Sequence, residues 1–145
     1  MTTIEEPTVE PREESLAASH RRTILIVDDD PAQVEVLSHR LRNLGFQAIS
    51  AHSGEAGLRL AKSEHPDLVL LDLRLPDTDG LSVCSQLVDS PATNDIPVII
   101  VSGMEQPDII RRTRAAGCRF YLRKPYDPNA LLTLIQNALD AADEW

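Results

Sequence analysis

Four apolar runs in this sequence are each followed by polar residues of types that bind metal ions or phosphate. The runs at 24–27, 68–71, 97–101 and 120–122 precede Asp28-Asp29-Asp30, Asp72, Ser102 and Arg123-Lys124-Pro125, respectively. If these runs are parallel strands of one sheet, their carboxyl ends meet at one edge, where α/β proteins carry their chemistry. An acidic cluster, a hydroxyl group and a lysine would then share that edge.

Such a set of side chains suits phosphoryl chemistry. Two carboxylates about 4 Å apart repel each other by about 4 kcal/mol at an effective dielectric of about 20, so the cluster needs a cation. An all-oxygen site of this kind suits Mg2+. Lys124 can pair with an anion and Ser102 can donate to it, which with the metal makes a site for phosphoryl oxygens. The remaining carboxylate is a candidate nucleophile that forms an acyl phosphate.

The rest of the pattern predicts the elements that bring these residues together. A fifth apolar run lies at 46–49, and helical segments are expected at about 31–44, 54–65, 81–88, 107–116 and 128–142. The runs at 24–27, 68–71 and 97–101 are continuously apolar, which is typical of strands covered on both faces. Alternating strands and helices with right-handed crossovers predict a doubly wound α/β sandwich.

Local signals mark the ends of these helices. Asp30 is expected to cap the first helix, Pro31 suits its first turn, and Gly45 suits the left-handed residue after it. The apolar positions of the first helix, spaced by three and four residues, predict an inward face made of Val34, Leu37, Leu41 and Leu44. Ser53 is a candidate cap for the second helix, and Gly117 closes the fourth.

Composition excludes several classes of protein. The chain has 145 residues, 42% of them hydrophobic, which fits one globular domain with a short tail. A formal charge of −9 disfavours direct binding to nucleic acid. No apolar stretch reaches the roughly 18 residues of a membrane-spanning helix, and there is no signal peptide. Cys84 and Cys118 lack metal-ligand spacing, so we expect two reduced structural thiols and a cytoplasmic protein.

Residues 1–22 differ in composition from the rest of the chain. They contain prolines, glutamates and small polar residues without an apolar period. Such a segment cannot bury enough apolar surface to offset the entropy lost on ordering. We therefore expect a flexible N-terminal tail at 1–22 and a folded domain at 23–143. A role of the tail in binding a partner stays open.

Four segments of the sequence resemble the signature blocks of response-regulator receiver domains of two-component signalling. They are ILIVDDDP (24–31), LVLLDLRLPDTDG (68–80), PVIIVSG (97–103) and FYLRKPY (120–126). The resemblance covers about residues 23–142, with the blocks in the family's order and spacing. It implies a flavodoxin-like fold: five helices around a five-stranded parallel sheet in the order 2-1-3-4-5.

The resemblance also implies roles for individual residues. Asp72 would be the phosphoacceptor and a ligand of Mg2+, Asp29 a direct metal ligand, and Asp28 a ligand acting largely through water. The family's pattern gives the remaining roles as follows: metal binding by the backbone carbonyl of Arg74, phosphoryl binding by Ser102 and Lys124, an aromatic switch at Tyr121, and a cis peptide bond before Pro125. The chain would catalyse only its own phosphorylation and dephosphorylation.

Two other functions are disfavoured by the same residues. An aspartate-nucleophile phosphohydrolase carries D-x-D directly after a strand, whereas this sequence has Arg74 two residues after Asp72. A calcium loop at Asp77-Thr78-Asp79-Gly80 lacks the later acidic ligand at the required distance. We interpret the segment 77–80 as a turn.

The resemblance implies a histidine kinase or a histidine phosphotransfer protein as phosphodonor. It also implies a downstream protein bound through the fourth helix, fifth strand and fifth helix. The fourth helix has Ile109 and Ile110 among arginines and suits partner contact, although a solvated basic face stays open. The chain ends after the last helix, so we expect a stand-alone receiver. The sequence does not separate a receiver that acts by binding partners from a relay intermediate.

Removing the tail tests the predicted domain boundary. Deletion of residues 1–22 is expected to leave the melting temperature within about 4 °C of the full chain, which is about 1 kcal/mol for a domain of this size. Thermal unfolding followed by circular dichroism measures the shift. A larger drop would mean that the tail packs on the domain.

Overall fold

Short apolar segments of the chain form a parallel five-stranded sheet in the computed structural model, which describes residues 21–103 and 107–143. The strands are β1 (Thr23–Val27), β2 (Gln47–Ala51), β3 (Leu68–Asp72), β4 (Val98–Ser102) and β5 (Phe120–Arg123). Their order is β2-β1-β3-β4-β5, and all four pairings are parallel. The predicted fold class and strand order are therefore confirmed.

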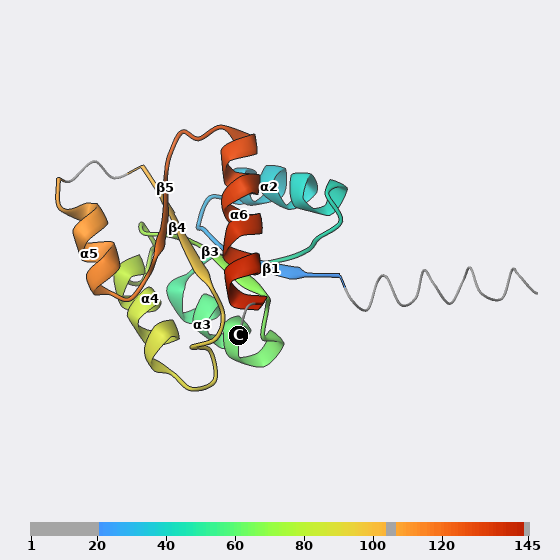
Figure 1. Ribbon diagram of the computed structural model, residues 1–145. Coiled ribbons are helices and arrows are strands. Elements are labelled where there is room, and N and C mark those ends of the chain that lie inside the picture. Colours follow the sequence, from blue (N-terminus) through green and yellow to red (C-terminus); the bar gives the residue numbers. More distant parts are fainter. Residues whose placement is uncertain (1–20, 104–106, 144–145) are drawn as a thin grey trace, which may run out of the picture.

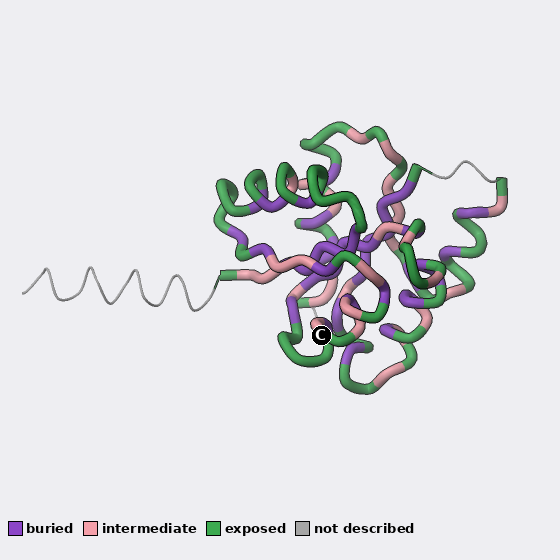
Figure 2. The backbone as a smooth tube through the Cα atoms, turned by 180° about the vertical axis from the view of Figure 1, so that it is seen from behind, coloured by how far each residue is buried: buried purple, intermediate pink, exposed green. Residues whose placement is uncertain are grey.

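Five helices of the described residues cover the two faces of the sheet (Figure 1). They are α2 (Pro31–Asn43), α3 (Gly54–Glu64), α4 (Gly80–Asp89), α5 (Ile109–Ala115) and α6 (Pro128–Asp143). One core cluster joins the sheet to α3, α4 and α5, and a second joins it to α2 and α6. Alternate residues of each central strand enter opposite clusters, so these strands are buried on both sides (Figure 2).

The predicted caps of the first two helices, and the predicted left-handed glycine after the first, agree with the structure. Asp30 caps α2 by accepting a hydrogen bond from the backbone N–H of Ala32 at 3.0 Å. Ser53 caps α3 through the N–H of Ala56 at 3.1 Å. Gly45, with a φ of 98°, adopts the left-handed conformation expected after the first helix.

The prediction was wrong about which residue is buried at the end of the first helix. Leu44 was expected on the inward face, but its side chain is 49% exposed, whereas Phe46 is buried. The helix ends at Asn43, and the backbone N–H of Phe46 returns to the carbonyl of Leu41 at 3.0 Å. This turn places Phe46 over the core before β2 starts at Gln47, one residue later than predicted.

The boundaries of one further helix differ from the sequence expectation. The fourth helix was expected at 107–116 but α5 has only seven residues, Ile109–Ala115. Of the predicted tail, residues 1–20 lie outside the described part of the chain. Arg22 contacts the folded domain: its carbonyl accepts from the N–H of Gln47 at 2.8 Å, and its guanidinium Nη1 donates to Asp143 at 3.3 Å.

The segment between β3 and α4 is held by backbone and carboxylate contacts. The carboxylate of Asp77 accepts from the N–H groups of Gly54 and Glu55, at 2.8 and 3.0 Å, at the start of α3. These bonds, Gly54 first, hold the pKa of Asp77 below its usual value. Asp79 caps α4 through the N–H of Leu81 at 3.0 Å. Both acids are therefore engaged in turn and cap contacts, in agreement with the turn interpretation.

Gly80 allows this segment to return close to the end of β3. Its N–H donates to the carbonyl of Leu73 at 2.9 Å. A Cβ atom at position 80 would lie 2.5 Å from the carbonyl oxygen of Asp72 and 2.6 Å from the Cα of Leu73. Since both are backbone atoms, a side chain here would displace the residue that ends β3.

Replacing Gly80 by alanine tests this close approach. We expect Gly80→Ala to lower the free energy of unfolding by about 1–3 kcal/mol, the usual cost of overpacking. Gly103→Ala is the control, because a Cβ there meets its nearest atom, the Cβ of Lys124, at an ordinary 3.8 Å. Urea unfolding measures both. Equal destabilisation by the two substitutions would contradict the packing explanation.

Candidate functional site

The polar residues singled out in the sequence lie at the carboxyl ends of adjacent strands. Asp28 follows β1, Asp72 ends β3, Ser102 ends β4 and Lys124 follows β5. Parallel pairing of β1 with β3, β3 with β4 and β4 with β5 brings these ends to one edge. The expected convergence of an acidic cluster, a hydroxyl-bearing residue and a lysine is therefore present in the structure.

Lys124 joins the site through its ammonium group. Its Nζ lies 2.8 Å from Oδ2 of Asp72 and 3.5 Å from Oδ2 of Asp28. A third contact, at 3.1 Å, reaches the amide oxygen of Gln33 in the first turn of α2. An ammonium group has three hydrogen-bond donors, so these three acceptors match its full capacity.

The surroundings of Lys124 favour its charged form. Burial disfavours the ammonium ion, but the hydrogen bond and charge of Asp72, followed by those of Asp28, outweigh it. The pKa of Lys124 therefore lies above its usual value. The lysine is a permanent positive charge at this edge of the sheet.

Asp28 is the buried acid of the site. Only 8% of the residue is exposed, and burial raises the pKa of its carboxyl group; Asp72 adds to this, while the N–H of Asp30 and the charge of Lys124 oppose it. The backbone of Asp28 is fixed as well, because its N–H donates to the carbonyl of Ala51 at 3.0 Å. Its neighbour Asp29 is exposed to solvent.

Asp72 is half-buried and has one carboxylate oxygen in each of two contacts. Oδ2 accepts from Lys124, and Oδ1 accepts from the backbone N–H of Arg74 at 3.0 Å. Arg74 in turn forms an isolated antiparallel bridge with Asp79. The segment after β3 thus holds the Asp72 carboxylate toward Lys124.

Ser102, Tyr121 and the Lys124–Pro125 peptide bond lie on the β4–β5 side of the site. Ser102 is fully buried, and its carbonyl accepts from the N–H of Lys124 at 2.9 Å. Tyr121 is half-buried on β5 opposite Ile100 and packs against the core cluster that contains α5 residues. The peptide bond between Lys124 and Pro125 is cis.

A small cavity and a larger open groove lie at this edge of the sheet. A small cavity of about 30 Å³ lies among Asp28, Asp72, Lys124 and the apolar side chains beneath them. Beside it runs an open groove of about 560 Å³ between α2 and the segment after β5, with Val36, Tyr126 and Pro128 in its lining. The site therefore opens to solvent along α2.

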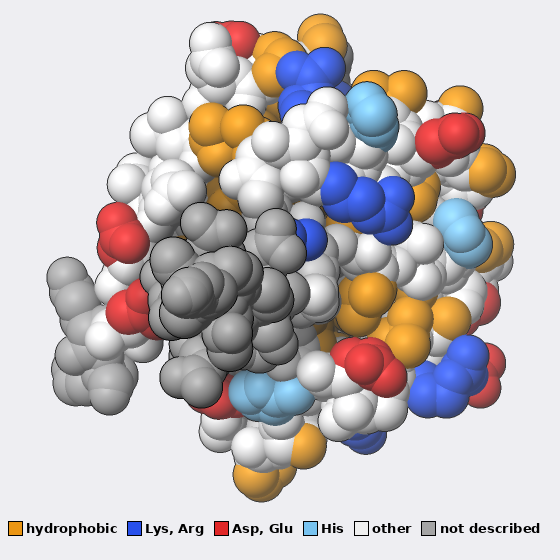
Figure 3. Space-filling model, turned by 90° about the vertical axis from the view of Figure 1, so that its right-hand side faces the viewer, with side chains coloured by type: hydrophobic (Ala, Val, Ile, Leu, Met, Phe, Trp, Pro, Cys, Tyr) orange, Lys and Arg blue, Asp and Glu red, His pale blue; other side chains and the backbone are white. Residues whose placement is uncertain are grey.

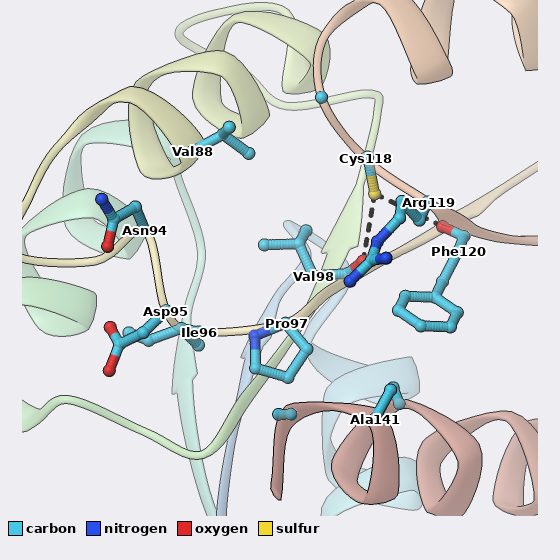
Figure 4. Close-up of a pocket in the computed structure, with 13 residues that line it drawn as sticks. Val88, Asn94, Asp95, Ile96, Pro97, Val98, Cys118, Arg119, Phe120 and Ala141 are labelled. Carbon is cyan, nitrogen blue, oxygen red and sulfur yellow. Dashed lines mark hydrogen bonds between the residues drawn. The ribbon is translucent and has the colours of Figure 1, made fainter. Parts of the chain in front are cut away.

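Another cavity, of about 300 Å³, lies at the opposite end of β4 and β5 (Figure 4). The Cys118 thiol beside it donates to the carbonyls of Val98 and Phe120, at 3.0 and 3.4 Å. Cys118 and Cys84 are both buried and not joined by a disulfide, as expected from the sequence.

Sequence reasoning missed Gln33 as a member of the site. Its position three residues after Asp30, on the first turn of α2, is the only sequence signal that it faces the strand ends. Its contact with Lys124 spans 91 positions along the chain, and such a contact is visible only when the chain is folded.

The donor set suits Mg2+, although the side chains alone do not enclose a metal. No group of three or more His, Cys, Asp or Glu side chains in residues 21–103 and 107–143 is arranged to hold an ion. Mg2+ does not need such a group, because it keeps several waters and takes one or two carboxylates. Asp28 and Asp72, which share Lys124, and their exposed neighbour Asp29 supply carboxylate oxygens of the required kind.

Comparison with known proteins identifies the family. The sequence model of the response regulator receiver domain matches residues 24–136. Protein PilH of Pseudomonas aeruginosa is 39% identical over 116 residues, which cover 80% of this chain and 96% of PilH. The polar-differentiation response regulator DivK of Brucella ovis is 31% identical over 83% of this chain and 98% of its own length.

Other relatives extend beyond this domain. The chain spans half the length of RpaA of Synechocystis, a DNA-binding dual master transcriptional regulator that is 37% identical over 120 residues. Among solved structures, a CheY-like receiver domain protein from Methanospirillum hungatei has a TM-score of 0.80 at 28% identity, covering 86% of this chain and 98% of its own.

Receiver domains are signalling modules without classical catalytic activity, and they generally bind Mg2+ at their phosphorylation site. No helix within the described residues has the length and apolar character needed to cross a membrane. The matched sequence, the strand order and the relatives together show that this chain belongs to the response regulator receiver family of two-component signalling.

Proposed function

We propose that this chain accepts a phosphoryl group on Asp72 from a histidine kinase or a histidine phosphotransfer protein, and that phosphorylation changes its binding of a downstream protein. The observation that carries the proposal is the contact of Asp72 with the ammonium group of Lys124 at 2.8 Å. The free, buried thiols fit a reducing compartment, so we place this activity in the cytoplasm.

In the proposed reaction, a carboxylate oxygen of Asp72 attacks the phosphorus atom of the donor. An O–P bond to Asp72 forms as the P–N bond of phosphohistidine breaks, and the imidazole leaves with the electron pair. Lys124 can pair with the phosphoryl oxygens because its Nζ already lies beside this carboxylate. Ser102, at the end of β4, donates its hydroxyl to the same oxygens.

Asp29, Asp72 and the carbonyl of Arg74 would hold Mg2+, with Asp28 acting largely through water. Bound Mg2+ would offset the negative charge of the phosphoryl group and of the acids. The donor must approach Asp72 over the exposed edge, and the groove along α2 supports such an approach because it is open beside Lys124.

Phosphorylation would be read through Ser102 and Tyr121. Ser102 must move toward Asp72 to reach the phosphoryl group, and the ring of Tyr121 would turn inward to fill the space. Since Tyr121 packs against the cluster that contains Ile109, this movement would reach α5. Shifting such an equilibrium from 1:99 to 99:1 needs about 5.5 kcal/mol of differential stabilisation. Contacts from Lys124, Ser102 and the metal contribute part of it.

Labelling with acetyl phosphate and Mg2+ tests the phosphoacceptor. We expect one phosphoryl group per chain, stable in acid and labile in base, and no labelling of Asp72→Asn. Asp77→Asn is the matched control in the same segment and should be labelled like the unmodified chain, because Asp77 contacts α3 and not Lys124. Labelling of Asp72→Asn at the unmodified rate would refute the assignment.

The proposed readout is tested by amide NMR with beryllofluoride, a phosphate mimic, and Mg2+. Signals of Ser102 and of residues 107–122 should shift more than those of 32–62, because the switch runs from Ser102 through Tyr121 to α5. Equal or reversed shifts in the two regions would exclude the surface of α5, β5 and α6 as the readout surface.

A further inference from the structure

Positive charge is concentrated in one segment of this acidic chain. The whole chain has a formal charge of −9, yet residues 107–123 contain five arginines, namely Arg111, Arg112, Arg114, Arg119 and Arg123. Asp108 is the single acidic residue of that segment. These residues belong to α5, to β5 and to the turn between them.

The arginine side chains of α5 point to different sides of the helix. Arg112 faces the start of α4, where its Nη2 lies 3.9 Å from Asp79. Ile110 and Arg114, four residues apart, share a side of the helix about half a turn away from Arg112, and Arg111 borders it. Ile110, Arg111 and Arg114 are all exposed, with 51% of Ile110 accessible. Ile109 and Thr113 face the core instead.

Edge strand β5 extends the same surface. Side chains alternate along a strand, so Arg123 lies on the same side of the sheet as Tyr121. Tyr121 packs with Ile109 of α5 in one core cluster, which identifies that side as the one that α5 covers. On α5 itself, the exposed Ile110 has the exposed side chains of Arg111 and Arg114 beside it.

On the face opposite α5, the side chains of the described residues that Figure 3 colours show no such separation of charge. Basic, acidic and apolar side chains are interspersed on the face in Figure 3, which lies on the far side from α5. A surface of mixed charge gives little preference for the charge of a partner. The α5–β5 surface is therefore distinguished by its sign and not by exposure alone.

We propose that Ile110, Arg111 and Arg114 form a docking surface for an acidic segment of a partner protein that inserts an apolar side chain against Ile110. This inference rests on the proposed function, in which α5, β5 and α6 form the readout surface, and it adds the chemistry of the partner. Arginine guanidinium groups bind carboxylates through pairs of hydrogen bonds, so the carboxylates of an acidic segment complement Arg111 and Arg114.

Charge disfavours two other occupants. A second copy related by a twofold axis would place this patch against itself, because such an interface is isologous. Arg111 and Arg114 would then face the same two arginines of the second copy and repel them. A nucleic acid extends its charge beyond the patch and would meet the field of a chain with a net charge of −9.

A designed peptide tests the surface without knowledge of the natural partner. The probe is a fluorescein-labelled helical peptide with glutamates flanking one leucine face, and its binding to the full chain is followed by anisotropy and amide shifts at low and high salt. Binding should weaken with salt and shift signals of 109–123. We expect Arg111→Glu/Arg114→Glu to weaken binding at least about tenfold, a difference of about 1.4 kcal/mol.

The matched control is Arg40→Glu/Arg59→Glu, which makes the same change in net charge on exposed positions of α2 and α3. It should bind the peptide nearly as the unmodified chain does. Equal losses in the two double variants would overturn the proposal in favour of general charge attraction. Absence of peptide binding, or tighter binding of a single-stranded DNA oligonucleotide, would also overturn it.

Phosphorylation separates this inference from the proposed function. Arg111→Glu/Arg114→Glu should still be labelled by acetyl phosphate, because neither residue contacts the site. Peptide affinity that changes with beryllofluoride supports both statements. If the unmodified chain binds the peptide at 109–123 but is not labelled, the proposed function fails and the surface stands. If it is labelled but does not bind, the surface fails alone.

Discussion

The site depends on the ion contacts that Lys124 makes with Asp72 and Asp28. Two acids from neighbouring strand ends share one ammonium group, at 2.8 and 3.5 Å. Without a cation between them, two carboxylates about 4 Å apart would repel each other by about 4 kcal/mol at a dielectric of about 20. Lys124 removes this cost in the absence of metal, and its removal would leave the buried Asp28 without its cation.

The same contact explains how Lys124 could exchange the Asp72 carboxylate for a phosphoryl group as its charged partner. A phosphoryl group on Asp72 brings new oxygens to Lys124, so the lysine keeps a charged partner as the carboxylate is consumed. Gln33 contacts Lys124 at 3.1 Å and belongs to α2, which lines the groove beside the site. The hydrogen bond between Gln33 and Lys124 therefore connects the site to α2, the helix that an approaching phosphodonor would meet.

Much of this arrangement could be predicted because its causes are local. Continuous apolar runs such as 68–71 predict buried parallel strands, and the acids that follow them reach one edge by topology. Asp30 and Gly45 were identified from the cap and left-handed turn that their residue types favour. Asp77, interpreted as part of a turn and not of a calcium loop, does lie in a turn.

What could not be predicted depends on contacts across the folded chain. Leu44 and Phe46 are both apolar and two residues apart, and only the hydrogen bond from Phe46 back to Leu41 decides which one is buried. The bond from Asp77 to the start of α3 joins residues 23 positions apart. The pattern and spacing of residues do not reveal contacts between positions far apart in the sequence, and Gln33 was missed for the same reason.

Chemical trapping of the acyl phosphate tests the central claim most directly. Borohydride reduces an aspartyl phosphate to homoserine, so treatment of the phosphorylated chain followed by peptide mass spectrometry locates the modified carboxylate. The contacts around Lys124 predict homoserine at position 72 alone, formed only when Mg2+ and a phosphodonor are present. Homoserine at position 28 or 29, or phosphate recovered on a serine or histidine with position 72 unchanged, would contradict this account.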